Sequence, residues 1–244
     1  MKFLKIILLL LVVLVVLGFI TIKVMSKERP KGQTGPEADS LATQVLAGLN
    51  KSAFDAIPYL RWEFFRPGQK YFWDKKANKA IIEWDNNKVI MQLDSQEAQS
   101  YSEGIKQEGA AHDELKKKAW SNWCNDSFWM IAPFKLFDSG TQREIMDLEN
   151  GNKGIKVTYV SGGVTPGDAY LWELDKNHRP VAWKMWTKII PVKGMGATWA
   201  GWEKHGGAWF STEHTLASKK MKMKNVKAGN SWADFGYESD PFAI

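Results

Sequence analysis

An uncharged apolar run near the N-terminus constrains this chain more than any other feature. The run extends over residues 6–22 and reads IILLLLVVLVVLGFITI. Its 17 residues are at the short end of what crosses a bilayer as a helix. A short basic segment with Lys2 and Lys5 precedes it. This arrangement predicts a signal anchor or transmembrane helix over residues 1–25.

A cleaved signal peptide is the alternative interpretation of the same run. Signal peptides have an apolar region of roughly 7–15 residues followed by a small-x-small cleavage site. This run is longer, and the sequence TIKVMS at 21–26 contains no such site. We therefore favour an uncleaved anchor with the domain on the periplasmic or extracytoplasmic side. The Lys and Arg residues after the run favour the opposite orientation, so the side stays open.

The net charge of +6 belongs mostly to the flanks of this run. Residues 1–31 contain six Lys or Arg residues and one Glu, which leaves 27 basic and 26 acidic residues in the remainder. A broad basic surface is therefore not expected, and we predict no nucleic-acid partner. The single Cys124 excludes an internal disulfide. The sequence contains no phosphate loop, no H-E-x-x-H and no spaced Cys/His set, so we predict no catalytic residues, metal ligands or cofactors.

The rest of the chain predicts one mainly β (α+β) domain over residues 37–226. A charged linker rich in Pro and Gly occupies 26–36, and a polar tail occupies 227–244. Apolar spacing predicts helices over 37–53 and 110–128. Alternating apolar residues between turn signals predict about eleven antiparallel strands. Their expected ranges are 59–66, 70–74, 79–84, 88–94, 143–148, 154–160, 168–174, 181–188, 197–203, 208–216 and 220–226.

Aromatic residues are the most informative part of this domain. The chain contains 13 Trp, 12 Phe and 6 Tyr, and many of them fall on predicted strands. They either fill the interior of a large sheet structure or line a cavity for an apolar ligand. If they line a cavity, we expect the ligand-binding residues to supply apolar contact area. Those residues are Trp62, Phe64, Trp84, Trp129, Met130, Trp183 and Met185.

The order of elements resembles the lipoprotein-carrier (LolA/LolB-like) superfamily. The resemblance is carried by EADSLATQVLAGLN followed by YLRWEFF, by DSFWMIAPFKLFDSG, and by the late hairpins ELDKNHRPVAWKMW and GATWAGWEKHGGAWFSTEHTL. It implies an unclosed antiparallel half-barrel with two or more helices on its concave face and an apolar cavity between them. No ligand-gating residue of that superfamily matches a position in this chain.

These observations favour a membrane-tethered, exported binding protein without enzymatic activity. Its expected partner is a lipid, another hydrophobic ligand or a lipidated protein, held in an aromatic cavity. One alternative is a cell-envelope scaffold with a packed core and a protein partner. A second is an enzyme for an apolar substrate, which a buried acidic or His side chain facing the cavity would indicate; the candidates are Glu63, Glu83, Glu173 and His214. The oligomeric state is not predicted.

Overall fold

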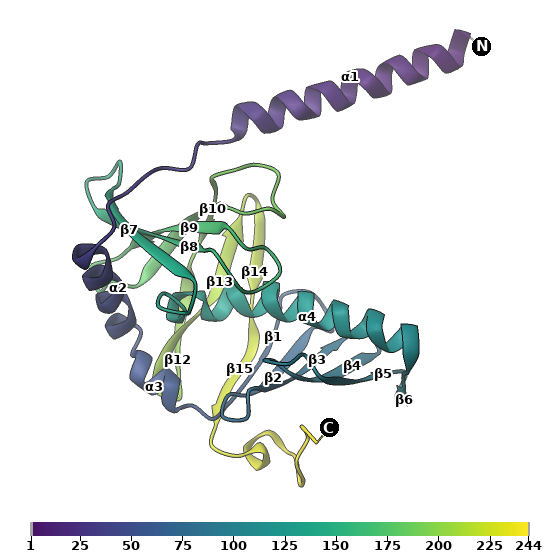
Figure 1. The fold of residues 1–244 in the computed structure, drawn as a ribbon, viewed down its shortest axis with the longest axis vertical. Coiled ribbons are helices and arrows are strands. Elements are labelled where there is room, and N and C mark those ends of the chain that lie inside the picture. The colour runs from purple at the N-terminus through teal and green to yellow at the C-terminus, as the bar shows by residue number, and fades with distance from the viewer. Residues whose placement is uncertain (1, 244) are drawn as a thin grey trace.

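A single apolar helix precedes the folded domain in the computed structural model, which describes residues 2–243. This helix, α1 (Lys2–Met25), projects from the body of the molecule (Figure 1). Residues Phe3–Met25 are long and apolar enough to cross a membrane, by length and composition. The N-terminal apolar helix expected from the sequence is therefore confirmed.

The first of two antiparallel sheets has seven strands in the order β15-β1-β2-β3-β4-β5-β6. Their bounds are β1 (Tyr59–Glu63), β2 (Lys70–Asp74), β3 (Lys79–Trp84), β4 (Asn87–Gln92), β5 (Ala98–Ser102), β6 (Ile105–Lys106) and β15 (Lys224–Gly229). Tight hairpins join its central strands. Trp84 pairs with Asn87 across a two-residue turn in which Asp85 adopts a positive φ, as hairpin turns of this length require.

The second sheet has eight strands, with the path β12-β13-β11-β10-β9-β8-β7 and β14 paired to β13. Their bounds are β7 (Thr141–Asp147), β8 (Lys153–Tyr159), β9 (Asp168–Leu174), β10 (Pro180–Trp186), β11 (Met195–Thr198), β12 (Ala200–His205), β13 (Ala208–Leu216) and β14 (Lys219–Lys222). Residues 2–243 thus contain fifteen strands. The sequence predicted about eleven. Strands were missed because short ones such as β6, and the division of 197–203 into β11 and β12, leave little periodic signal.

The chain joins the two sheets near its C-terminus. β14 pairs with β13 in the second sheet, and β15 pairs with β1 in the first, with only Met223 between them. Met223 donates its backbone N–H to the carbonyl of Thr212. The two sheets do not close into a barrel within the described residues. The mainly β, unclosed antiparallel class expected from the sequence is therefore confirmed.

Helices cover one side of the two sheets (Figure 1). α2 (Pro36–Gly48) begins with Pro36 and carries Glu37 and Asp39 in its first turn, which suits a helix N-terminus. α3 (Lys51–Ala56) follows after Asn50 at a positive φ, so the expected single helix over 37–53 is divided in two. α4 (Gly109–Ile131) crosses the sheets, and the short 3₁₀ helix η1 (Ala132–Phe134) follows it at Pro133.

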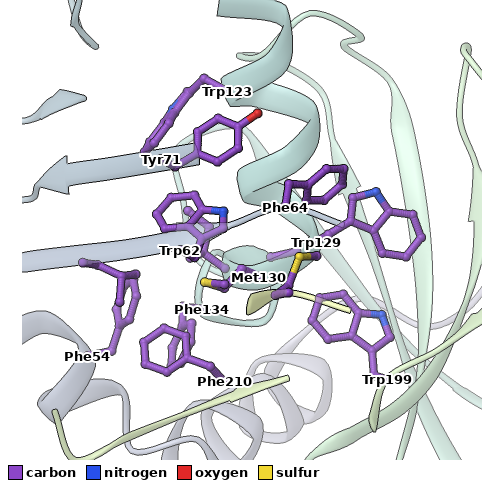
Figure 2. Close-up of a cluster of buried hydrophobic side chains, with 14 of the residues drawn as sticks. Phe54, Trp62, Phe64, Tyr71, Trp123, Trp129, Met130, Phe134, Trp199 and Phe210 are labelled. Atoms are coloured by element: carbon purple, nitrogen blue, oxygen red, sulfur yellow. The ribbon is translucent and has the colours of Figure 1, made fainter. Parts of the chain in front are cut away.

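The main core lies between these helices and the sheets. Figure 2 shows its aromatic centre, where Trp62 and Tyr71 of the first sheet meet Trp123 of α4, and Trp129 of α4 lies near Trp199. The Trp62 and Tyr71 rings stack with centroids 5.0 Å apart. Phe54 and Phe134 stack at 4.0 Å. Each of these buried aromatic side chains removes a large apolar area from water and so stabilises the domain.

The segments expected to be a linker and a tail also pack on the sheets. The linker pairs at the edge of the second sheet, and the tail packs on the face of the first sheet that points away from the main core. Gln33 forms a β-bridge with Ile145 at the edge of the second sheet. Beyond β15, the 3₁₀ helix η2 (Trp232–Phe235) leads to Phe242, which is buried against Phe72 at a centroid distance of 4.8 Å. β15 itself continues to Gly229, three residues past the domain end expected from the sequence. The composition of both segments is polar, but each contains residues that contact a sheet, such as Gln33 in the first and Phe242 in the second.

Candidate functional site

An apolar cavity of about 790 Å³ lies between α4 and the second sheet and also reaches the first sheet. α4 contributes Phe128 and Trp129, and β10 contributes Trp183 and Met185. Two loops line it as well, the β8–β9 loop at 160–167 and the β10–β11 loop at 187–194. This volume falls within the range of small-molecule sites.

Packed aromatic rings form one wall of the cavity. Trp183 has its ring centroid 4.9 Å from that of Trp129 and 4.6 Å from that of Tyr170. Phe128 lies 4.9 Å from Tyr170 and 5.2 Å from Tyr159. These rings come from a helix and from three neighbouring strands, so their positions are mutually fixed. The wall is therefore preformed and offers contact area rather than directional bonds.

Six buried polar atoms of residues on the cavity lining find no hydrogen-bond partner within the described residues. They are the Tyr159 hydroxyl, the Thr187 Oγ1, the Asn122 Nδ2, the Arg66 Nε and the indole Nε1 atoms of Trp73 and Trp183. Burial raises the pKa of Tyr159 well above its usual value, so this hydroxyl stays protonated and can donate. Most buried polar groups in proteins are paired. Together with charged lining residues such as Arg66 and Lys219, these atoms give the site points that can bind a polar group.

A buried carboxylate fixes α4 against the first sheet beside the cavity. Asp126 accepts a hydrogen bond from the Tyr71 hydroxyl at 2.5 Å and an ion-paired one from Arg66 at 2.7 Å. Desolvation by burial raises the pKa of Asp126, and the bonds from Tyr71 and Arg66 oppose this rise. Arg66 lines the cavity, with its guanidinium 5.3 Å from the Phe64 ring centroid. The cluster positions Arg66 at the cavity wall.

None of the histidine and acidic candidates, His214, Glu63, Glu83 and Glu173, lines this cavity. His214 is 1% exposed and packs edge-on against Trp199, and its Nδ1 lies 3.0 Å from the Thr198 carbonyl oxygen. Desolvation lowers its pKa to about 4, so it is neutral at pH 7. Glu173 pairs with Lys184 at 3.7 Å. Glu63 and Glu83 line a separate hollow of about 500 Å³.

No metal site is formed by the part of the chain that the structure describes. Among residues 2–243, no group of three or more His, Cys, Asp or Glu side chains is placed to hold a metal ion. Cys124 lines the cavity, and burial raises the pKa of its thiol to about 12, which removes thiolate character at neutral pH.

All seven residues selected from the sequence lie in the main core cluster, and four of them line the cavity. The four are Phe64, Trp129, Trp183 and Met185. The other three, Trp62, Trp84 and Met130, are packed within the core. Trp62 has no exposed surface and stacks on Tyr71. The sequence thus identified the aromatic interior. Which of these residues line the cavity is decided by how the helices and sheets pack.

Several cavity residues were not selected from the sequence. Tyr159 and Tyr170 lie on strands with ordinary alternation, and nothing marks them as different from core tyrosines. The β10–β11 loop carries a weak signal, since Ile189 and Ile190 come directly before Pro191 in a segment that otherwise contains turn-forming residues.

Comparisons with known proteins give a distant structural similarity alone. No protein-family model matches the chain, and no curated protein matches it. Among solved structures, a DUF1329 family protein from Desulfovibrio piger is similar over 81% of this chain and 96% of that chain, with a TM-score of 0.45 and 12% identity. A similarity at this level says nothing about ligand or activity. The comparisons give no name from the LolA/LolB-like superfamily.

Proposed function

We propose that this protein is a membrane-tethered binding protein that holds a lipid, or another hydrophobic ligand, in the cavity between α4 and the second sheet. In this proposal α1 is an uncleaved anchor and the domain lies on the extracytoplasmic side. The observation that carries it is the cavity of about 790 Å³ with an aromatic wall. An acyl chain fits such a wall, because its binding depends on contact area and not on directional bonds.

The unpaired polar atoms favour an amphiphile over a pure hydrocarbon. The Tyr159 hydroxyl and the Asn122 Nδ2 are donors, and the Thr187 hydroxyl both donates and accepts. A ligand with one or two oxygen atoms on an apolar body satisfies these groups. The charged residues of the lining are four basic ones, Arg66, Lys118, Lys135 and Lys219, and three acidic ones, Asp94, Asp138 and Asp168. This excess of one positive charge favours an anionic head group.

Binding without catalysis is also part of the proposal. The buried carboxylate on the cavity lining is Asp168, and both of its oxygens already accept hydrogen bonds, from Thr165 and from the backbone of Lys188. A general base needs an accessible lone pair directed at substrate. The size of the cavity also counts against a scaffold with a fully packed interior, which was the alternative interpretation of the sequence.

Photocrosslinking of the full chain in lipid nanodiscs tests this function. The probe is a phospholipid with a diazirine at the end of one acyl chain, and mass spectrometry maps the labelled peptides. We expect label on α1 and, in addition, on the segments that contain Phe128–Trp129 and Trp183–Met185. Label confined to α1 would show that no acyl chain enters the cavity, and would overturn the proposal.

A pair of matched variants makes the same experiment specific to the cavity. Leu216 lines the cavity, so Leu216→Trp fills part of it and is expected to reduce cavity labelling several-fold. Val181→Trp adds the same side chain at an exposed position on β10. It is expected to leave cavity labelling unchanged. Equal labelling in both variants would mean that the label does not report on the cavity.

A further inference from the structure

The segment after α1 is docked on the domain and is not a free tether. The backbone N–H of Lys27 donates to the carbonyl of Lys193 at 2.9 Å, and the N–H of Lys193 donates to the Ser26 hydroxyl at 3.1 Å. The Trp186 indole donates to the carbonyl of Lys27 at 2.9 Å. The first two residues after α1 are thus bound to the end of β10 and to the β10–β11 loop.

The same segment remains bound to the sheet further along. Arg29 donates to the Thr158 hydroxyl and to the carbonyl of Gly167. Lys156, which is 2% exposed, donates to the carbonyl of Pro30. The two Arg29 contacts lie at the ends of β8 and β9 that adjoin the β8–β9 loop, and Lys156 lies at the middle of β8. The position where the chain leaves α1 is therefore fixed relative to two loops of the domain.

The length of α1 sets the depth of that position in a bilayer. The apolar segment Phe3–Met25 has 23 residues and is about 35 Å long at helical rise. The hydrocarbon core is about 30 Å thick, and each head-group layer adds roughly 5–8 Å. With α1 spanning the bilayer as proposed above, Ser26 falls in the head-group layer, and Lys193, whose backbone N–H is bonded to the Ser26 hydroxyl, falls at the same level.

Both loops at this level carry exposed apolar side chains. Ile189 of the β10–β11 loop is 61% exposed, and Val164 of the β8–β9 loop is 46% exposed. Asp168 ties the loops together, because its Oδ1 accepts the N–H of Lys188 at 2.9 Å and its Oδ2 accepts the Thr165 hydroxyl at 2.6 Å. Ile189 and Val164 also line the cavity, so they stand at its entrance.

Cationic residues accompany the apolar ones. Lys27, Lys188 and Lys193 lie in or beside the docked segment and the β10–β11 loop. Apolar side chains with adjacent Lys residues suit the interface of a bilayer that contains anionic lipids, because the lysines are attracted to the negative surface.

We propose that the β8–β9 and β10–β11 loops insert Val164 and Ile189 into the bilayer that α1 spans, so that the cavity opens onto the membrane instead of onto water. The inference depends on the proposed anchoring role of α1, but not on what fills the cavity. It makes the membrane the source of the ligand, since a lipid can enter without crossing water. It also places the exposed side chains of Val164 and Ile189 in contact with lipid, at the depth at which the docked segment holds the two loops.

Site-specific fluorescence of the full chain in nanodiscs tests the placement. Single cysteines are introduced in a Cys124→Ser background and labelled with a nitrobenzoxadiazole probe, and the discs contain anionic phospholipid with or without doxyl-labelled acyl chains. The test positions are Ile189→Cys and Val164→Cys. Val12→Cys in α1 is the positive control, and Ile105→Cys, at an exposed position on β6, is the matched negative control.

We expect doxyl lipids to quench the probe at 189 and 164 several-fold more than at 105, with emission shifted to the blue. Quenching at 12 with none at 189 or 164 would overturn the inference. Absence of quenching at position 12 would show that α1 does not lie in the bilayer, and would overturn both the proposed anchor and this inference. Quenching at 189 without acyl crosslinks in the cavity would leave the inference standing and overturn only the proposed function.

Discussion

The indole Nε1 of Trp186 donates a hydrogen bond to the carbonyl oxygen of Lys27 at 2.9 Å, across 159 positions of sequence. Trp186 belongs to the outer face of the second sheet, because Trp183 and Met185 on the same strand point to the core. This bond joins the end of α1 to the domain and underlies the membrane placement described above.

Trp186→Phe keeps an aromatic ring and removes this bond. We expect a loss of about 1 kcal/mol in the free energy of unfolding and faster tryptic cleavage after Lys27, because the docked segment opens more often. Trp202→Phe removes a comparable bond, from the Trp202 indole to the carbonyl of Pro180, and is the control. It is expected to lower stability without faster cleavage at Lys27. Equal cleavage rates in wild type and Trp186→Phe would contradict the docking contact.

Stability is expected to fall between pH 7.5 and pH 5 because of His214. Its pKa is lowered from 6.5 to about 4, so the folded state favours the neutral ring. The stabilisation is therefore present above the unfolded pKa of 6.5 and is lost as pH falls toward 4, with about 2 kcal/mol lost by pH 5. Urea unfolding of the full chain in nanodiscs at the two pH values measures this difference.

His214→Gln removes the titrating ring, and we expect it to abolish most of the pH difference while lowering stability at pH 7.5. His205→Gln is the matched control, since His205 is partly exposed and lies on the neighbouring strand β12. It is expected to retain the pH difference of the wild type. A His214→Gln protein with the full wild-type pH dependence would show that another group titrates.

Cys124 is expected to be unreactive in the folded protein. With its pKa raised to about 12, roughly one thiol in ten thousand is ionised at pH 8, against about a quarter for an ordinary cysteine. Alkylation by iodoacetamide, followed by intact mass, should be at least 100-fold slower in the native chain than in the urea-unfolded chain. Similar rates in the two states would show that the thiol is accessible and ionised.

Gly48→Ala is expected to destabilise the domain although alanine is the better helix former. A Cβ at position 48 would lie 2.3 Å from the carbonyl oxygen of Asn177, in the turn between β9 and β10. We expect a loss of about 1–3 kcal/mol. Ala47→Gly, at the exposed neighbouring position, should lose about 1 kcal/mol through helix propensity alone. A gain of stability in Gly48→Ala, by thermal unfolding, would contradict the close approach of α2 to this turn.

The sequence alone determined α1, the antiparallel character of the domain and the aromatic interior. These features depend on local patterns, since an apolar run, a period of two and a turn signal such as Asp85–Asn86 act within a few residues. The division of the first helix at Asn50 was not found, because the apolar spacing continues across it.

Only the tertiary structure decided which aromatic residues form a wall and which are core. Trp62 and Trp183 have the same pattern along their strands and are both fully buried, but only Trp183 belongs to the lining of the cavity beneath α4. Alternation tells which face a side chain occupies, and it does not tell what packs on that face. The docking of Ser26 and Lys27 was equally hidden, because a serine hydroxyl and a lysine backbone form such bonds in many settings and the residue types do not indicate the partner.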